Sequence, residues 1–392
     1  MRILISTGEV SGDLQGALLV SALQRQAALL DIDLEIVALG GDRMAEAGAT
    51  LLHQTTAIGS VGIWESLPYI LPILGIQRQV RRYLQNHPPD RVVLIDYMGS
   101  NLPIGRSVRR QFPQVPIFYY IAPQEWVWSF GRNGTAQIIR ITDRLLAIFP
   151  EEAKYFRDRG ASVRWVGHPL VDRMQGAPQR EQARQILGIQ PEEIAVALLP
   201  ASRQQEIQYL LPNLFKAAQQ LQRQYSQLRF WIPLSLERFR APIQQAVESY
   251  RLNATLVSRA SDPQSVLNVL AAADLALTKS GTVNLELALL NVPQVVVYRV
   301  SPITAWIAKN LLQFSIPFMS PANLVTMEPI VPEFLQDQAT PENIAATAAE
   351  LLGNSKRRQQ MLADYQRMQQ ALGEPGVCDR TAQEILKFSA GV

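Results

Sequence analysis

The strongest constraint in this 392-residue sequence is a repeated alternation of short apolar runs and longer runs with helical spacing. In the first half, Val-, Ile- and Leu-rich runs typical of buried parallel strands separate segments whose apolar residues recur every three to four positions. The predicted strands are 2–7, 35–39, 91–95, 117–121, 144–148 and 163–166, and the predicted helices are 14–26, 70–86, 104–111 and 151–159. Alternation of this kind predicts βαβ units and therefore an open parallel sheet covered by helices.

The same alternation begins again after the segment Val166-Gly167-His168-Pro169-Leu170. The second set comprises predicted strands 195–199, 229–233, 254–257, 275–278 and 294–298, and predicted helices 179–187, 205–224, 241–250, 263–272, 283–290 and 341–352. We therefore expect two Rossmann-like α/β domains, residues 1–168 and 169–352. Residues 353–392 are expected to form helices that pack back on the first domain or on a partner.

Composition limits the kind of protein this can be. With 47% hydrophobic residues, 18% charged residues and a net charge of +3, the chain can bury large cores but carries no extended basic surface for nucleic acid. The single cysteine, Cys378, excludes an internal disulfide or a multi-cysteine metal site, and the three histidines have no metal-ligand spacing. We find no apolar run of signal-peptide or membrane-spanning length, so we expect a cytoplasmic protein that is soluble or peripheral.

The first turn that could take part in binding or catalysis follows the first predicted strand. It contains Gly8, Glu9, Ser11, Gly12 and Asp13. Its glycine spacing matches neither a dinucleotide fingerprint nor a phosphate loop, but it lies at the carboxyl end of a strand, where open α/β sheets bind their ligands. The alternative is that Ser11 or Asp13 only caps the following helix.

Two further turns, in the second half, favour binding of an anion. Each follows a predicted strand and precedes a helix, so backbone N–H groups and cationic side chains would face a ligand. The candidate residues are Ser202, Arg203 and Glu206 in one turn and Lys279, Ser280, Gly281, Thr282 and Glu286 in the other. The alternative for the first is a capping box from Ser202 to Gln205. Together they predict a nucleotide diphosphate site in which Glu286 accepts the ribose hydroxyls.

Three segments are unusually apolar or aromatic: residues 61–76, 126–128 and 306–318. Ordinary core packing is the alternative. However, two prolines interrupt the first segment, and an arginine cluster follows it, which favours a membrane interface or an apolar substrate. The candidate membrane or acyl contacts are Trp64, Tyr69, Ile70 and Trp306.

Several motifs together resemble one family, the lipid-A-disaccharide synthases, which are inverting transferases of glycosyltransferase family 19. The motifs run through nearly the whole chain: TGEVSGDLQGA, VGIWESL, PPDRVVLID, YIAPQEWVW, VGHPLVD, LLPASRQQEI, KSGTVNLELALLNVPQVVVYR and PANLV. The resemblance implies a GT-B fold, two domains facing across a cleft. It also implies transfer of 2,3-diacylglucosamine from its UDP carrier to the 6-hydroxyl of 2,3-diacylglucosamine 1-phosphate, with release of UDP.

The resemblance also implies roles for particular residues. It maps UDP contacts onto Ser202, Arg203, Glu206, Ser280, Gly281, Thr282 and Glu286, and adds Asn323 of the PANLV segment. It implies no cofactor and no metal, peripheral association with the inner face of the cytoplasmic membrane, and a possible homodimer.

One departure from the family concerns the catalytic base. The family usually reads IDAPDFN, whereas this chain reads Ile95-Asp96-Tyr97-Met98-Gly99-Ser100-Asn101, so Gly99 stands in place of the second acid. The remaining candidates for the base are Asp96, Glu9 and Asp13, with Asp96 or Glu9 preferred. The change leaves two alternatives: a related GT-B enzyme with a different lipid or sugar acceptor, or a catalytically silent UDP-sugar-binding relative. A smaller departure is Ala201 in place of a glycine.

Overall fold

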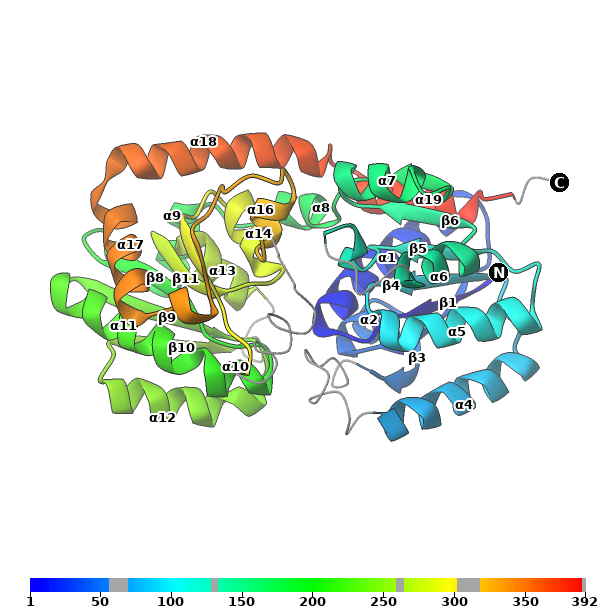
Figure 1. Cartoon of the computed structure of the whole chain (residues 1–392), viewed down its shortest axis with the longest axis horizontal. Helices are drawn as coiled ribbons and strands as arrows, with labels where there is room; N and C mark the ends of the chain where they lie inside the picture. Colours follow the sequence, from blue (N-terminus) through cyan, green and yellow to red (C-terminus); the bar gives the residue numbers. More distant parts are fainter. Residues whose placement is uncertain (56–69, 128–132, 259–263, 302–317, 390–392) are drawn as a thin grey trace. The chain divides into compact units, whose positions relative to one another are not determined.

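The computed structural model describes residues 1–55, 70–127, 133–258, 264–301 and 318–389, with only the backbone for residues 70–73 and 133. The chain forms two compact units (Figure 1). The first consists of Met1–Arg173 together with Ala371–Val392, and the second is Met174–Gln370. Each unit is described separately below.

The first unit is built on a parallel sheet of seven strands among its described residues, in the order β3-β2-β1-β4-β5-β6-β7. The strands are β1 (Arg2–Ser6), β2 (Glu35–Gly40), β3 (Thr50–Gln54), β4 (Arg91–Ile95), β5 (Ile117–Tyr120), β6 (Arg144–Ala147) and β7 (Val163–Trp165). The central strands are almost completely buried, which explains their continuous apolar sequences.

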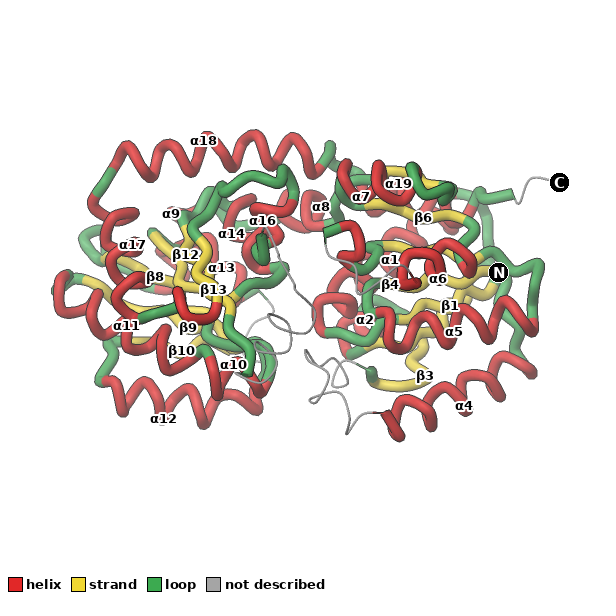
Figure 2. The backbone as a smooth tube through the Cα atoms, in the orientation of Figure 1, coloured by secondary structure: helices red, strands yellow, loops and turns green. Residues whose placement is uncertain are grey.

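Helices cover both faces of this sheet (Figure 2). They are α1 (Val10–Leu29), α2 (Asp42–Glu46), α4 (Ile70–Asn86), α5 (Met98–Gln111), α6 (Asn133–Ile141), α7 (Pro150–Arg157), α8 (Leu170–Gln175), which runs into the second unit, and α19 (Val377–Leu386). Buried side chains of α4, α5 and α6, such as Val80, Val108 and Ile138, join the sheet in one core. Helix α19 packs against α1, so the end of the chain completes the first unit.

The second unit repeats this architecture with six described strands in the order β10-β9-β8-β11-β12-β13, all parallel. The strands are β8 (Ile194–Leu199), β9 (Leu228–Leu234), β10 (Ala254–Ser258), β11 (Leu275–Lys279), β12 (Gln294–Tyr298) and β13 (Glu333–Leu335). The helices are α9 (Arg180–Leu187), α10 (Gln204–Tyr209), α11 (Leu211–Gln224), α12 (Arg240–Tyr250), α13 (Ser265–Ala272), α14 (Val283–Leu289), α16 (Pro321–Leu324), α17 (Pro341–Gly353) and α18 (Ser355–Leu372).

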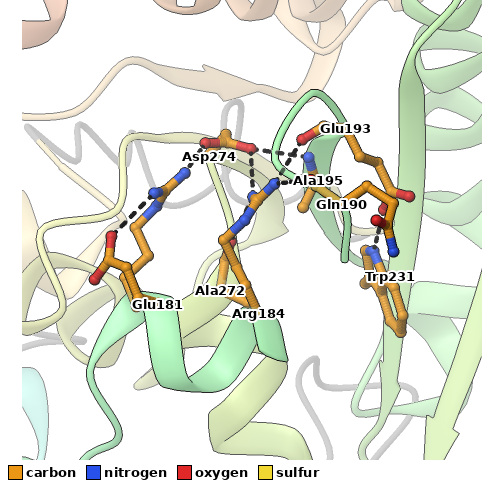
Figure 3. A network of polar contacts seen from close by, with 9 residues as sticks. Glu181, Arg184, Gln190, Glu193, Ala195, Trp231, Ala272 and Asp274 are labelled. Atoms are coloured by element: carbon orange, nitrogen blue, oxygen red, sulfur yellow. Dashed lines mark hydrogen bonds and ion pairs between the residues drawn. The ribbon is translucent and has the colours of Figure 1, made fainter. Parts of the chain in front are cut away.

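A polar network fixes the amino ends of β8 and β11 in the second unit (Figure 3). The Asp274 carboxylate accepts the backbone N–H of Ala195 at 2.9 Å and a guanidinium hydrogen bond from Arg184 at 3.2 Å. Arg184 is buried and also donates to the backbone oxygens of Gln190 and Glu193. Because this network lies at the strand ends opposite to the predicted binding turns, we assign it to stability.

The predicted pair of parallel α/β domains is confirmed. The sequence analysis missed the edge strands β3 and β13, because edge strands need less apolar surface than central strands. It also placed one helix over 205–224, where the structure has α10 and α11, since Pro212 starts a new helix. The predicted cleft between the domains stays a prediction.

Candidate active site

The predicted turns lie at equivalent positions of the two sheets. In the first sheet β1 lies between β2 and β4, and in the second β8 lies between β9 and β11. Strand order reverses at these points, so the turns after β1 and β4, and those after β8 and β11, border the crevice where open α/β sheets bind ligands. The predicted turns therefore place candidate acids and cations at the switch point of each sheet.

The second unit brings Arg203, Glu206 and Lys279 together. The Glu206 carboxylate lies 3.6 Å from the Arg203 guanidinium and 3.8 Å from the Lys279 ammonium, and it accepts the backbone N–H of Ser202 and Arg203 at 2.5 and 3.0 Å. Glu206 thus accepts the backbone N–H of Arg203, the N-cap residue of α10, which is one half of a capping box, so the alternative box from Ser202 to Gln205 is wrong by one residue. The carboxylate holds two cations at the ends of adjacent strands, an arrangement suited to an anionic ligand.

Tyr298, the last residue of β12, belongs to the same edge but was missed by the sequence analysis. Burial raises its pKa to about 12, with smaller opposing contributions from the charges of Arg203 and Glu206. Its hydroxyl is therefore protonated at neutral pH and can donate a hydrogen bond. The strand itself was predicted, but the adjacency of β11 and β12 becomes visible only in the folded sheet.

A buried asparagine stabilises the turn that follows β11. Asn284 accepts the backbone N–H of Gly281 at 2.8 Å and donates to the oxygen of Lys279 at 3.1 Å. The Ser280 hydroxyl donates to the backbone oxygen of Met319 at 2.6 Å, Thr282 is the N-cap residue of α14, and Glu286 is buried in the first turn of this helix. The turn is therefore rigid, and Glu286 lies on the helix that starts at it.

Asn323 is placed differently from a ligand contact. Its side chain is buried, donates to the backbone oxygen of Val331 at 2.9 Å and to the Glu333 carboxylate at 2.5 Å, and accepts the Val331 N–H at 2.8 Å. Because these bonds use both ends of the amide, Asn323 joins α16 to β13.

In the first unit, the glycines after β1 are explained by contacts within the chain. A Cβ on Gly12 would overlap the Thr7 hydroxyl, and a Cβ on Gly8 would lie 2.5 Å from Cδ1 of Tyr97. Side chains of the protein thus fill the space that the sequence analysis assigned to an approaching ligand. The glycines allow α1 and Tyr97 to pack closely against the end of β1.

Asp13 lies in the interior beside the start of α2. It is 4% exposed, and its carboxylate accepts the backbone N–H groups of Gly41, Arg43 and Met44 at 2.8, 3.2 and 3.2 Å. Burial raises its pKa, and these three hydrogen bonds lower it in part. The carboxylate is committed to holding α2, which favours a structural role over proton transfer.

Asp96 and Glu9 are both half-buried at the switch point of the first sheet. Asp96 has a positive φ of 54°, and its backbone oxygen accepts hydrogen bonds from Tyr119 at 2.6 Å and Asn101 at 3.1 Å. Asn101 in turn accepts the Ser6 hydroxyl at 2.8 Å, so it ties the ends of β1 and β4 together. Strained backbone of this kind persists where surrounding bonds determine it, as here.

The charges of Glu9 and Asp96 shift the pKa values of two different tyrosines. Burial raises the pKa of Tyr97, and the Glu9 carboxylate raises it further; burial and Asp96 do the same for the pKa of Tyr119. Tyr119 is buried in the core, whereas Tyr97 is half-buried and lies against Gly8 and Gly99. The charge of Glu9 therefore acts on Tyr97, the residue that lies beside Gly99.

His168 is a neutral structural residue. Burial lowers its pKa to about 3, and its Nδ1 accepts the backbone N–H of Leu170 at 3.2 Å, which requires the proton to be on Nε2. Its backbone N–H donates to Leu372 at 2.8 Å, so it joins the two segments of the first unit.

We expect the contribution of His168 to the stability of the first unit to fall as pH decreases from 6.5 to 3. In that interval the unfolded chain binds a proton at His168 that the folded chain does not, so the stabilisation is complete above pH 6.5 and is lost as pH falls. At pH 5 the loss is about 2 kcal/mol. Between pH 7.5 and pH 5, urea unfolding should show a change in stability that is less favourable in the wild type than in His168→Asn by about 2 kcal/mol, because the asparagine amide oxygen can accept the Leu170 N–H without titrating.

Comparison with this variant isolates His168 from Glu152, which lies nearby on α7 and acts in the opposite sense. Burial raises the pKa of Glu152 to about 7, so its contribution to stability is lost as pH rises from 4.5 to 7 in both proteins. Exposed His87, replaced by asparagine, is the matched control. An equal pH dependence in wild type and His168→Asn would contradict the assignment.

A hollow of about 540 Å³ lies along β7 and α19 and contains none of the predicted site residues. Glu384 pairs with Arg144 at 3.5 Å and with Arg164 at 3.4 Å, while Arg380 donates to backbone oxygens of Val166 and Glu374. Its arginines are engaged within the fold, and we assign it no role in the reaction.

Most of the predicted membrane contacts lie outside the described residues. These are Trp64, Tyr69 and Trp306; Ile70 is the first residue of α4, where only the backbone is described. None of the helices in the described residues is long and apolar enough to cross a bilayer. The same residues contain no group of three His, Cys, Asp or Glu side chains that could hold a metal ion.

Solved structures share this fold over almost the whole chain. The S. aureus MnaA–UDP co-structure aligns with a TM-score of 0.65 at 16% identity, covering 98% of this chain and 95% of that one. MurG of Acinetobacter baumannii aligns with a TM-score of 0.56 at 16% identity, covering 99% of each chain. Two Rossmann-like parallel sheets, with the predicted turns at their switch points, define a protein of the GT-B fold class.

The sequence comparisons are more specific. Residues 3–388 match the family model described as lipid-A-disaccharide synthetase. The lipid-A-disaccharide synthase of Gloeothece citriformis is 59% identical over 99% of this chain and 100% of that protein, and that of Synechocystis is 54% identical over 100% and 98%. The chain belongs to the lipid-A-disaccharide synthase family, which confirms the resemblance recognised in its motifs.

Proposed function

We propose that this glycosyltransferase moves a 2,3-diacylglucosamine unit from UDP to the 6-hydroxyl of 2,3-diacylglucosamine 1-phosphate. In the proposal, the second unit binds the UDP part of the donor and the first unit binds the acceptor and removes its proton. The observation that carries it is the cluster of Arg203, Glu206 and Lys279 at the switch point of the second sheet.

The cluster supports a diphosphate leaving group for an electrostatic reason. Negative charge grows on the diphosphate as the glycosidic bond breaks, and cations fixed in advance stabilise that charge without reorganising. Glu206 fixes them here, since it contacts both cations and accepts the backbone N–H of Arg203. Tyr298 adds a protonated hydroxyl to the same edge, and Glu286 remains our candidate for the ribose hydroxyls.

Glu9 is the acid that we propose as the general base. Inversion requires a carboxylate that takes the proton of the attacking hydroxyl. Asp13 is committed to three backbone N–H groups, and the charge of Asp96 acts on the buried Tyr119. Glu9 is half-buried at the start of α1, and its charge acts on Tyr97 beside Gly99.

The test is an assay of UDP release with the diacylated donor and the diacylated acceptor. We expect stoichiometric UDP and a β-1′,6-linked disaccharide. Release of UDP only with another acceptor would favour a related GT-B enzyme, and UDP-sugar binding without any turnover would favour a silent relative. The possible homodimer stays a prediction.

We further propose that residues 61–76 attach the enzyme to the inner face of the cytoplasmic membrane. The exposed side chains of Leu74 and of Arg78, Arg81 and Arg82 on α4 support this proposal, because an apolar segment beside cations is typical of an interfacial anchor.

Replacing Trp64 and Ile70 together by serine should reduce sedimentation with anionic phospholipid vesicles several-fold, because apolar surface drives insertion into the interface. Replacing the exposed Leu29 and Trp165 by serine is the matched control and should leave sedimentation unchanged. Equal sedimentation of both double variants and the wild type would contradict the anchor.

A further inference from the structure

The space beside Gly99 is occupied by the ring of Tyr97. A Cβ built on Gly99 would lie 3.1 Å from Cε1, 3.2 Å from Cζ and 3.3 Å from the hydroxyl oxygen of this tyrosine. The same ring also contacts Gly8, where a Cβ would lie 3.1 Å from Cγ and 3.2 Å from Cε1. The ring therefore bridges the turn after β1 and the first turn of α5.

This contact explains why position 99 is a glycine. Contacts of 3.1 to 3.3 Å are tighter than nine in ten real Cβ contacts, so with a side chain at position 99 the ring would have to shift by a few tenths of an ångström. The resembled family carries alanine at position 97 and aspartate at position 99, and this chain carries tyrosine and glycine. The two differences fit one physical exchange, in which an aromatic ring replaces a carboxylate in the same space.

The exchange changes the chemistry available at this place. Burial and the nearby Glu9 carboxylate both raise the pKa of Tyr97, so its hydroxyl keeps its proton at neutral pH. A protonated phenol can donate a hydrogen bond but cannot remove a proton from an alcohol, unlike a carboxylate.

We propose that the Tyr97 hydroxyl takes the place of the missing carboxylate and binds a hydroxyl of the acceptor saccharide, holding it beside Glu9. This inference rests on the proposed function, because it concerns the acceptor of that reaction. Tyr97 is then a positioning residue, and proton removal falls to Glu9. Tyr97 is only half-buried and the neighbouring Gly99 is exposed, so this residue keeps solvent-facing surface that a sugar could contact.

The first test uses Tyr97→Phe, which removes the hydroxyl and keeps the ring against Gly8 and Gly99. We expect the acceptor KM to rise about tenfold, in line with the loss of one hydrogen bond, while the donor KM and the melting temperature stay at the wild-type values. Tyr83→Phe on α4 is the matched control and should change none of these quantities.

The second test exchanges the pair. Gly99→Asp alone should lower the melting temperature and the rate, because the new side chain meets the ring. Tyr97→Ala combined with Gly99→Asp should recover a rate above that of either single variant, since it removes the ring and supplies a carboxylate. If Tyr97 has only a structural role, the double variant should recover the melting temperature but not the acceptor KM.

The outcomes distinguish this inference from the proposed function. If the wild type forms no disaccharide, the proposed function fails. The role of Tyr97 can still be tested, because calorimetry compares the acceptor affinity of the wild type with that of Tyr97→Phe. If the wild type forms disaccharide and Tyr97→Phe keeps its acceptor KM, the assignment of Tyr97 is overturned. If the wild type neither binds nor converts the acceptor, both are overturned.

Discussion

Replacing Glu9 by glutamine is expected to lower kcat by about two to four orders of magnitude, the usual contribution of a positioned general base. Glutamine keeps the size of the side chain and its place at the start of α1, but it cannot accept the proton of the acceptor hydroxyl. Donor KM and UDP affinity should stay within about twofold of the wild type, because the proposed UDP contacts lie in the second unit. Steady-state kinetics with both substrates and calorimetry with UDP measure these quantities.

Two companion variants decide whether the loss is specific. Glu151→Gln changes an exposed acid on α7 and should retain wild-type kinetics. Asp96→Asn tests the other preferred acid. A large loss of kcat in Asp96→Asn together with a near-normal rate in Glu9→Gln would move the base to Asp96.

The fold could be predicted from the sequence where burial dominates. Strands such as β4 and β8 are nearly completely buried, so their apolar runs are long and unbroken. Strand β3 contains His53 and Gln54 and is only half-buried, and no periodicity distinguishes it from a loop. Likewise, the sequence analysis started this helix at residue 104, because the preceding Pro103 is typical of a helix break. In the structure α5 begins at Met98 and contains Pro103.

The candidate site could be predicted where it depends on the chemistry of one turn. Arg203 and Lys279 were identified as cations after strands, and the sheet brings both to within 4 Å of the Glu206 carboxylate. The glycine turn after β1 was harder to interpret, because a glycine leaves room equally for a ligand and for a side chain from elsewhere. Only the structure shows that Tyr97, 89 positions after Gly8 in the sequence, fills that room.

The same distinction applies to the acids. Asp13 and Glu9 lie four residues apart in one motif, and from the sequence both are candidates for the catalytic base. In the structure Asp13 accepts three backbone N–H groups of the α2 segment, 28 to 31 positions away. A side chain whose partners are distant backbone groups has no local sequence signal, so capping of a remote helix and catalysis cannot be separated before folding.

Replacing Arg203 by alanine is expected to lower kcat and kcat/KM together by about two orders of magnitude. An interaction that strengthens as charge develops on the leaving diphosphate contributes to both quantities, whereas a contact equally strong in the ground state would mainly raise KM. The fold should tolerate the change, since the Arg203 side chain is 30% exposed and Glu206 retains Lys279 at 3.8 Å and the N–H groups of its own turn. Arg203→Lys should fall between, because an ammonium keeps the charge but loses bidentate geometry.

The matched control for this prediction is Arg223→Ala, which removes an exposed arginine from α11 in the same unit. It changes the net charge of the chain by the same amount, so it separates a local effect of Arg203 from general attraction of the anionic donor. If both variants lose rate equally, and high salt lowers the wild-type rate to the same level, the charge of the whole unit steers the donor and Arg203 has no special place. If only Arg203→Ala loses rate, and a salt-independent part of the loss remains, the guanidinium acts on the diphosphate where the bond breaks.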